Sequence, residues 1–286
     1  MLTTKTKVAL AAAAYRCIST GRRFLGKGDS VIVKRHGIRY HVDLNEGIDF
    51  SIYLLGAFEP GTRQTLEKLI RPGDIAFDLG ANIGAHTLTK AKSVGPSGKV
   101  FAFEPADFAI EKLRRNLALN PFLEERTFPQ QILLAAQSEQ RAEREIYASW
   151  PLARSGTIHP KHRGRLVSAA HAVVDTLDAF VARCAVPRLD VIKMDVDGYE
   201  LPALQGATET LRRFRPILVM EMSPYVHAER GYNFAEFVAL LRDAGYFLTN
   251  ADTQEPVALD AAQLERLIPD GASVNVVARN RELAAP

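Results

Sequence analysis

Cysteine, tryptophan and net charge are all scarce in this sequence of 286 residues. Its two cysteines, Cys17 and Cys184, stand far apart, and two isolated cysteines provide neither a disulfide framework nor a zinc site. The formal net charge is only +3, so nothing global demands a polyanionic partner such as nucleic acid. Apolar runs fall well short of the roughly 20 residues of a membrane span. These absences favour a cytoplasmic protein with an ordinary globular core.

The N-terminal region is expected to form a small cover. The apolar run over 8–14 is shorter than the core of a secretory signal, so it indicates an ordinary N-terminal helix. Residues 30–44 alternate apolar and polar side chains around His36-Gly37, which is typical of a β-hairpin. We therefore expect a helix and hairpin cover over residues 1–60 and a main domain over residues 61–286.

From residue 62 onwards, short apolar strands alternate with helical patterns. Strands are predicted over 75–79, 99–103, 131–136, 191–194, 217–220, 246–249 and 274–278. Helices are predicted over 62–70, from about 84, and over 108–119, 200–214 and 234–244. This alternation predicts a doubly wound α/β fold with a mostly parallel sheet. Ligands of such sheets bind at the carboxyl ends of the strands, so functional residues are expected there.

A glycine-containing turn follows the first predicted strand. Asp78, Gly80, Asn82 and Gly84 occupy it, and asparagine replaces the middle glycine of the usual dinucleotide loop. Asparagine tolerates left-handed backbone better than most residues. A carboxylate so close to the helix N-terminus would repel a pyrophosphate but attract a cationic ligand such as S-adenosylmethionine. The alternative is a tight turn with a capping acid.

The second predicted strand ends in an acid, Glu104, followed by Pro105. An acid about 20 to 25 residues past such a turn accepts hydrogen bonds from both ribose hydroxyls of a nucleoside cofactor. Capping of the next helix is the alternative role of Glu104. His86, in the first turn of the helix after the glycine turn, is predicted either to orient cofactor or substrate or to be a packed helix residue.

Acids gather after the strand at 191–194. Lys193 lies inside this apolar strand and needs a carboxylate partner, because a buried charge is costly without one. Asp195, Asp197 and Glu200 follow at the strand end, and such crowding perturbs pKa values. Asp195 is the strongest candidate for a general base. A lysine–carboxylate brace with Asp197 capping a helix is the alternative.

Other candidate residues lie near the same strand ends. Glu221 ends the fifth strand and is a second candidate base or a substrate contact, whereas His227 is predicted on a surface loop. Trp150 is expected to stack on a sugar or to belong to the core. It opens the irregular segment 150–165, which is predicted to be a substrate cover or a plain solvated loop. That segment carries Arg154, His159, Lys161, His162, Arg163 and Arg165.

Several segments together resemble the FkbM family of methyltransferases, in order, over roughly residues 30 to 280. They are GIDFSIYLLGAFE (47–59), FDLGANIGAHTL (77–88), FAFEPA (101–106), VDTLDAF (174–180), IKMDVDGYELPALQGA (192–207) and NVVAR (275–279).

The resemblance implies a Rossmann-like class I methyltransferase fold with a seven-stranded sheet whose last strand is antiparallel. It implies S-adenosyl-L-methionine as cofactor and O-methylation of a hydroxyl, typically on a sugar, glycan or natural product. By the same resemblance, Asp78, Gly80, Asn82 and Gly84 line the methionine end of the cofactor, and Glu104 holds the ribose.

A magnesium site is not expected. Some related sugar methyltransferases bind Mg²⁺ through an acid after the fourth strand and an acidic pair after the fifth. Here Asp195 and Asp197 supply the first part, but Glu221 stands between two methionines, so one of the paired acids is missing. A three-carboxylate octahedral site is therefore incomplete.

Other activities share some of these features. An NAD-dependent oxidoreductase shares the sheet and the Glu104 position, but Asp78 and the missing middle glycine disfavour it. A metal-dependent glycosyltransferase uses an acid pair such as Asp195 and Asp197, which leaves the turn at Asp78 unexplained. A nucleic-acid methyltransferase is disfavoured because 223–225 (SPY) lacks one proline of the amino-methylation signature and follows the wrong strand. A non-enzymatic binding protein is a further alternative, and the oligomeric state stays open.

Overall fold

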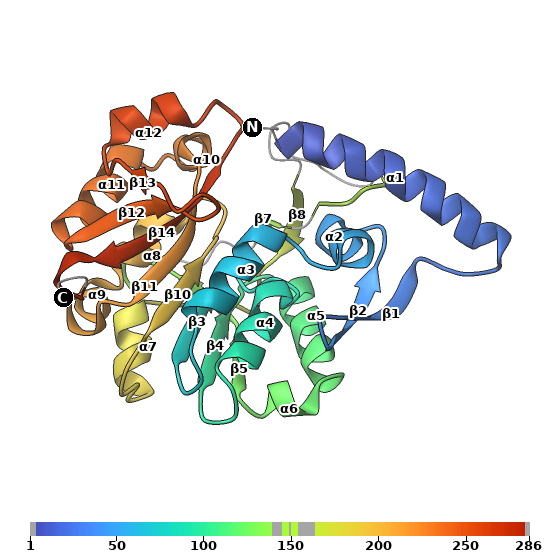
Figure 1. Cartoon of the computed structure of the whole chain (residues 1–286), viewed down its shortest axis with the longest axis horizontal. Coiled ribbons are helices and arrows are strands. Elements are labelled where there is room, and N and C mark those ends of the chain that lie inside the picture. The colour runs from blue at the N-terminus through green and yellow to red at the C-terminus, as the bar shows by residue number, and fades with distance from the viewer. Residues whose placement is uncertain (1–3, 139–144, 149, 154–163, 284–286) are drawn as a thin grey trace.

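The computed structural model describes residues 4–138, 145–148, 150–153 and 164–283. Its centre is one twisted sheet with helices on both faces (Figure 1). In spatial order, the strands are β13 (Pro256–Val257), β12 (Tyr246–Asn250), β14 (Val274–Asn280), β11 (Ile217–Met222), β10 (Val191–Met194), β3 (Ile75–Leu79), β4 (Lys99–Phe103) and β5 (Thr127–Gln130). This confirms the predicted α/β class.

The sheet differs from the prediction in its number of strands. The strands from β11 to β5 are parallel, and β14 runs antiparallel between β11 and β12, as expected for the last strand. The described sheet has eight strands rather than seven, because the two-residue β13 pairs with the outer edge of β12. A strand this short carries no periodic signal in the sequence.

The third predicted strand is present, but it does not belong to the main sheet. The apolar run at 131–136 led to the prediction, but the sheet edge is β5, a less apolar strand that contains Pro129. Proline is tolerated at an edge because one side of an edge strand needs no donors. The apolar residues that follow form β6 (Ile132–Leu134), which pairs with β9 (Val173–Asp175) outside the main sheet. A separate hairpin is formed by β7 (Glu145–Ala148) and β8 (Arg165–Ser168).

Alternate residues of the central strands face opposite layers of helices. The helices are α3 (Pro60–Leu69), α4 (Ala85–Ser93), α5 (Asp107–Ala118), α6 (Pro121–Glu124), α7 (Leu177–Arg183), α8 (Glu200–Gln205), α9 (Thr208–Phe214), α10 (Pro224–Glu229), α11 (Phe234–Asp243), α12 (Ala261–Leu267) and the 3₁₀ turn η1 (Arg281–Leu283). Phe77 and Met194 pack with α7, α8 and α11 on one face. Ala76 and Val191 pack with α3 and α4 on the other.

The helix predicted over 200–214 is two helices, α8 and α9, which break at Gly206. A side chain at Gly206 would lie 2.1 Å from the carbonyl oxygen of Ala135, so the chain approaches the end of β6 too closely for any other residue. Because this contact joins residues far apart in the sequence, the helical periodicity over 200–214 gave no sign of the break between α8 and α9.

The N-terminal region forms the predicted helix and hairpin. It contains α1 (Thr4–Phe24), β1 (Ser30–Arg35), β2 (Ile38–Asp43) and α2 (Gly47–Leu55). Figure 1 shows α1 lying along one end of the molecule, with the hairpin and α2 beside α5. Side chains of these elements share an apolar cluster with Ile83 of the turn after β3, Leu88 of α4 and Leu113 of α5. Within the described ranges, no helix combines the length and apolarity that a membrane crossing requires.

Candidate active site

The glycine turn after β3 packs directly against the end of β10. Gly80 has a φ of +79°, and a Cβ there would lie 1.8 Å from the carbonyl oxygen of Asp195. Asn82 has a φ of +46° and Gly84 one of +91°, so both also adopt left-handed backbone. The prediction that Asn82 stands where this geometry is needed is confirmed. The turn thereby brings the ends of β3 and β10 together.

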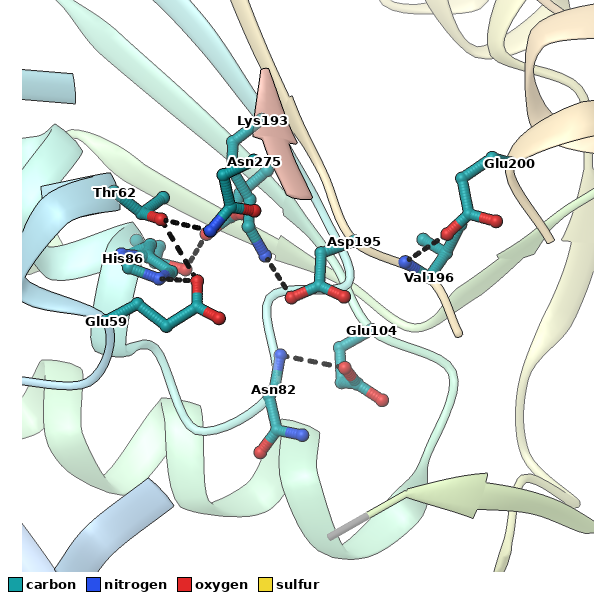
Figure 2. Close-up of polar contacts among 12 residues, drawn as sticks. Glu59, Thr62, Asn82, His86, Glu104, Lys193, Asp195, Val196, Glu200 and Asn275 are labelled. Carbon is teal, nitrogen blue, oxygen red and sulfur yellow. Dashed lines mark hydrogen bonds and ion pairs between the residues drawn. The ribbon is translucent and has the colours of Figure 1, made fainter. Parts of the chain in front are cut away.

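Glu104 holds this turn from the end of β4. Its Oε2 accepts a hydrogen bond of 2.8 Å from the backbone nitrogen of Asn82, and its Oε1 accepts one of 2.8 Å from that of Ala106 (Figure 2). Burial raises the pKa of Glu104 to about 7, although the two backbone donors oppose the rise. Glu104 is therefore a buried carboxylate whose two oxygens are fixed in orientation.

These strand ends surround one pocket that contains about 980 Å³ of empty space, its open mouth included. Its apolar wall includes Phe103, Ile132, Leu133, Leu134 and Ile146, and its polar wall includes Gly80, Asn82, His86, Glu104, Lys193 and Asp195. Six of the nine predicted site residues thus line one cavity. The roles assigned to them from the sequence stay predictions.

Asp78 lies beneath the pocket and is not one of its lining residues. The carboxylate is fully buried, 2.9 Å from Nζ of Lys90, and accepts a hydrogen bond of 2.5 Å from Thr87. Burial alone would raise the pKa of Asp78, but the ammonium groups of Lys90 and Lys193 outweigh it and lower that pKa. The acid of the turn is therefore already paired with Lys90 of α4, and the charge of Lys193 in β10 also acts on it. Gly84 also lies outside the pocket wall.

Lys193 and Asp195 form the predicted pair at the end of β10. Nζ of Lys193 lies 3.2 Å from Oδ2 of Asp195, and the side chain of Asp195 is 25% exposed (Figure 2). Burial would lower the pKa of Lys193, but the carboxylates of Asp195, Asp78 and Glu59 outweigh it and raise that pKa. The lysine is therefore a buried cation surrounded by acids, and the expectation that it needs a carboxylate partner is confirmed.

His86 lies on α4 with its ring buried against the pocket. Nε2 lies 3.7 Å from Oε2 of Glu59, and the ring centroid is 5.7 Å from that of Phe58. Burial lowers the pKa of His86 below its usual value. His86 is thus a packed helix residue that also borders the cavity.

Glu221 is the second-last residue of β11, close to the strand end where it was predicted, because the strand runs two residues beyond 220. It pairs in register with Asn275 of β14 and does not line the pocket. Burial, followed by the charge of Asp195, raises its pKa well above the usual value. Glu221 therefore lies close enough to Asp195 for the charge of Asp195 to raise its pKa.

The prediction for His227 was wrong. Its side chain is 1% exposed in α10, with Nε2 3.3 Å from Oε2 of Glu200, and its ring packs against Phe234 and Phe237. Burial lowers the pKa of His227 to about 4, and burial raises that of Glu200 to about 7. Oε1 of Glu200 also accepts hydrogen bonds from the backbone nitrogens of Val196 and Gly198. His227 is buried because the chain after β11 folds back and packs α10 against α11.

Residues 154–163 of the predicted substrate cover lie outside the described residues. On either side of them, Trp150 lines the pocket, and Arg165 lies 3.2 Å from Glu46. The ring of Trp150 is 5.8 Å from that of Phe58, which comes from the segment before α3. The N-terminal cover thus supplies part of the pocket wall.

Several pocket residues were not singled out from the sequence. Among them are Phe58, Tyr199, Arg230 and Ile48. The guanidinium carbon of Arg230 lies 4.5 Å from the ring centroid of Tyr199, and its Nε donates to the carbonyl oxygen of Asp197. These residues follow no strand end directly, so the rule that located the others could not find them. Within the described ranges, no cluster of three or more histidine, cysteine, aspartate or glutamate side chains could hold a metal ion.

Comparison with known proteins gives matches of several kinds. A hexuronic acid methyltransferase, AglP of Haloferax volcanii, is 28% identical over 148 residues, which are 51% of this chain and 55% of that protein. This chain therefore spans about half the length of that relative. The methyltransferase FkbM of Methylobacillus flagellatus has 15% identity and a TM-score of 0.43, covering 76% of this chain and 50% of that chain. M. jannaschii TYW2, solved in complex with AdoMet, has 14% identity and a TM-score of 0.43, and the match covers 88% of this chain and 85% of that chain.

The sequence also matches the methyltransferase FkbM domain over residues 78–248. This range begins at the buried acid of β3 and ends in β12, and it contains Glu104, Lys193 and Asp195. Because it covers more than half of the sequence, the chain belongs to the FkbM methyltransferase family.

Proposed function

We propose that this chain transfers a methyl group from S-adenosylmethionine to a hydroxyl group of a carbohydrate. The observation that carries the proposal is the fixed carboxylate of Glu104 in a pocket at the carboxyl ends of β3, β4 and β10. Membership of the FkbM family supports the reaction class. The alternatives of glycosyl transfer and hydride transfer have no comparable support.

The described residues fit the cofactor chemically. Each oxygen of Glu104 uses one acceptor site for a backbone donor, so each has an acceptor site left for a ribose hydroxyl. Phe103, Leu133 and Ile146 provide an apolar surface for a purine. The charge of Asp78 below the turn is balanced by Lys90, so the turn itself offers backbone rather than a free acid.

When bound, the cofactor supplies an electrophilic methyl group. The protein holds the acceptor hydroxyl against it, and this alignment is the main catalytic contribution. We assign Asp195 as the carboxylate that takes the hydroxyl proton. Lys193 holds this carboxylate at 3.2 Å and keeps its direction fixed. Glu221 is the second candidate for this proton.

The acceptor is proposed from the relative and from the pocket wall. AglP is named a hexuronic acid methyltransferase, and aromatic rings such as Phe58 and Trp150 pack well on sugar rings. A net charge of +3 gives no strong attraction to nucleic acid. A carbohydrate is therefore proposed as the acceptor. We also propose that the reaction needs no bound metal and that the protein is cytoplasmic.

The proposal is tested by calorimetric titration with S-adenosylmethionine, with NAD as a control ligand. We expect Glu104→Gln to weaken cofactor binding at least about tenfold, since it removes a charge-assisted acceptor. Glu111→Gln, an exposed acid on α5, is the matched control and is expected to bind like the wild type. Methyl transfer is then measured on glucuronides, neutral polyols and a transfer RNA. Tighter binding of NAD, or transfer to RNA alone, would contradict the proposal.

A further inference from the structure

Glu59 adopts a backbone conformation that glutamate rarely takes. Its φ is +42° and its ψ is 73°, at the position directly before Pro60. A non-glycine residue with positive φ is uncommon, and a following proline further restricts its backbone. Such residues persist only where their surroundings hold them, and they concentrate at functional sites. Glu59 also lies outside residues 78–248, the range matched to the FkbM domain.

A chain of contacts fixes one oxygen of Glu59. Oε2 accepts a hydrogen bond of 3.1 Å from Oγ1 of Thr62, and that hydroxyl accepts one of 3.0 Å from Nδ2 of Asn275 (Figure 2). The same Oε2 lies 3.7 Å from Nε2 of His86. Among the described residues, Oε1 has no hydrogen-bond partner, and the side chain is 27% exposed. One carboxylate oxygen is therefore held and the other is available.

Glu59 does not itself line the pocket that Asp195 lines, but it lies next to two residues that do. Its chain neighbour Phe58 and its contact His86 both line the cavity. The charges of both Glu59 and Asp195 raise the pKa of Lys193, so both carboxylates act on one ammonium. Figure 2 shows the carboxylates of Glu59 and Asp195 on either side of the amine of Lys193. The two acids thus come from different parts of the chain and lie around one buried ammonium at the edge of the cavity.

His86 indicates that a ligand group is needed here. Its ring is 4% exposed and borders the cavity. Nε2 has only the 3.7 Å contact with Oε2 of Glu59, and Nδ1 has no hydrogen-bond partner among the residues that the structure describes. Buried polar groups without partners are rare, and each requires an explanation. A hydroxyl group both donates and accepts, so one hydroxyl can serve the carboxylate of Glu59 and a nitrogen of His86.

We infer that Glu59 is a second acceptor-binding carboxylate, which takes a hydrogen bond from an acceptor hydroxyl other than the one that is methylated. The inference rests on the proposed function and deepens it, because it requires an acceptor with at least two hydroxyls. Asp195 takes one hydroxyl, and Glu59 binds another. Phe58, the residue before Glu59, has its ring centroid 5.8 Å from that of Trp150, and both rings line the pocket and offer apolar faces to a sugar ring. Phenols and simple alcohols would leave Oε1 of Glu59 and Nδ1 of His86 without hydrogen-bond partners.

The first test compares methyl glucuronide with its monodeoxy forms as acceptors. We expect the wild type to prefer the full compound over one monodeoxy form by about tenfold or more in kcat/KM, because a polar site rejects an analogue that lacks the bonded hydroxyl. Glu59→Gln is expected to lower that preference to about one and to leave the Kd for S-adenosylmethionine unchanged. Glu67→Gln, an exposed acid on the helix that Glu59 precedes, is the matched control and is expected to keep the preference. Preference retained in Glu59→Gln overturns the inference.

The second test needs no acceptor. Glycine suits the left-handed position, so Glu59→Gly is expected to melt at the same temperature as the wild type or higher. A Tm lower by several degrees would assign Glu59 to holding the fold and overturn the inference. A wild type that binds S-adenosylmethionine but methylates only phenols or monohydric alcohols also overturns it, and leaves methyl transfer standing. A wild type that fails to bind the cofactor overturns both.

Discussion

Gly80 and Asp195 meet backbone to backbone: a Cβ on Gly80 would lie 1.8 Å from the carbonyl oxygen of Asp195. The turn after β3 and the end of β10 therefore have a fixed relative position, and both line the pocket. This contact joins the residues expected to bind cofactor to the candidate base.

Gly80→Ala is accordingly expected to weaken cofactor binding by more than tenfold and to destabilise the fold by about 1–3 kcal/mol, as overpacking does. Calorimetry and urea unfolding measure the two effects. Gly271→Ala separates the clash from backbone strain, since Gly271 has a φ of +76° and a Cβ there would meet no atom within 4 Å. Equal losses of cofactor affinity and of unfolding free energy in both variants would show that backbone strain, and not the contact with Asp195, is responsible.

Lys90→Met should be among the most destabilising single changes in the chain. Lys90 and Asp78 are both fully buried, 2.9 Å apart, and removing one partner of a buried ion pair costs about 3–5 kcal/mol. The double variant Asp78→Asn with Lys90→Met is expected to lose less than the single Lys90→Met, because no unpaired charge is then buried. Urea unfolding measures the wild type, the two single variants Lys90→Met and Asp78→Asn, and the double variant, with the exposed Lys68→Met as control. A double variant that loses the sum of both single effects would contradict the pairing.

The cofactor affinity is expected to rise with pH across neutrality. Glu104 has a pKa of about 7 against its ordinary value of 4.5, so it is mostly protonated at pH 6 and mostly ionised at pH 8. An ionised carboxylate accepts hydroxyl hydrogen bonds more strongly, and we expect up to roughly a tenfold gain in affinity over that range. Calorimetry at several pH values measures this gain, and Glu104→Gln is expected to remove it.

Glu104 is also expected to make the free energy of unfolding depend on pH. Because the folded pKa lies above the unfolded one, the folded protein binds more protons between about pH 4.5 and 7. The contribution of Glu104 to the free energy of unfolding therefore falls as pH rises through that window. Glu104→Gln should flatten this part of the stability curve, and an unchanged slope would count against the raised pKa.

Asp195→Asn is expected to lower kcat by about 10²-fold or more while cofactor binding is retained, since it removes the proposed proton acceptor. Glu221→Gln tests the other candidate in the same assay. Glu221 does not line the pocket, so we expect its loss to reduce kcat far less. The reverse order of effects would transfer the role to Glu221.

Methyl transfer is expected to continue at full rate in the presence of EDTA. Asp195 is already paired with the ammonium of Lys193 at 3.2 Å, and a divalent cation would have to displace it. Assays with EDTA, and with EDTA followed by excess Mg²⁺, measure the requirement. Loss of activity with EDTA and recovery with Mg²⁺ would contradict the prediction.

Local patterns alone determined the central part of this molecule. Strands β3, β4 and β10 are short and mostly apolar, so their ends, and with them Glu104 and Asp195, could be located from the sequence. The need of a buried Lys193 for a carboxylate partner follows from the cost of burying charge, wherever the partner lies. The left-handed geometry at Asn82 follows from the residue types of the turn.

The tertiary structure decided what depends on approach between distant segments. Register in the sheet places Asp78 beside Lys193, and packing of α4 brings Lys90 to the same acid, so a predicted pocket acid became a buried partner. Folding of the N-terminal cover brings Glu59 to His86, and the return of the chain after β11 buries His227. None of these pairs has a fixed spacing in the sequence. Their contacts exist only because burial of separate apolar faces brings the segments together, and a local pattern contains no information about which faces meet.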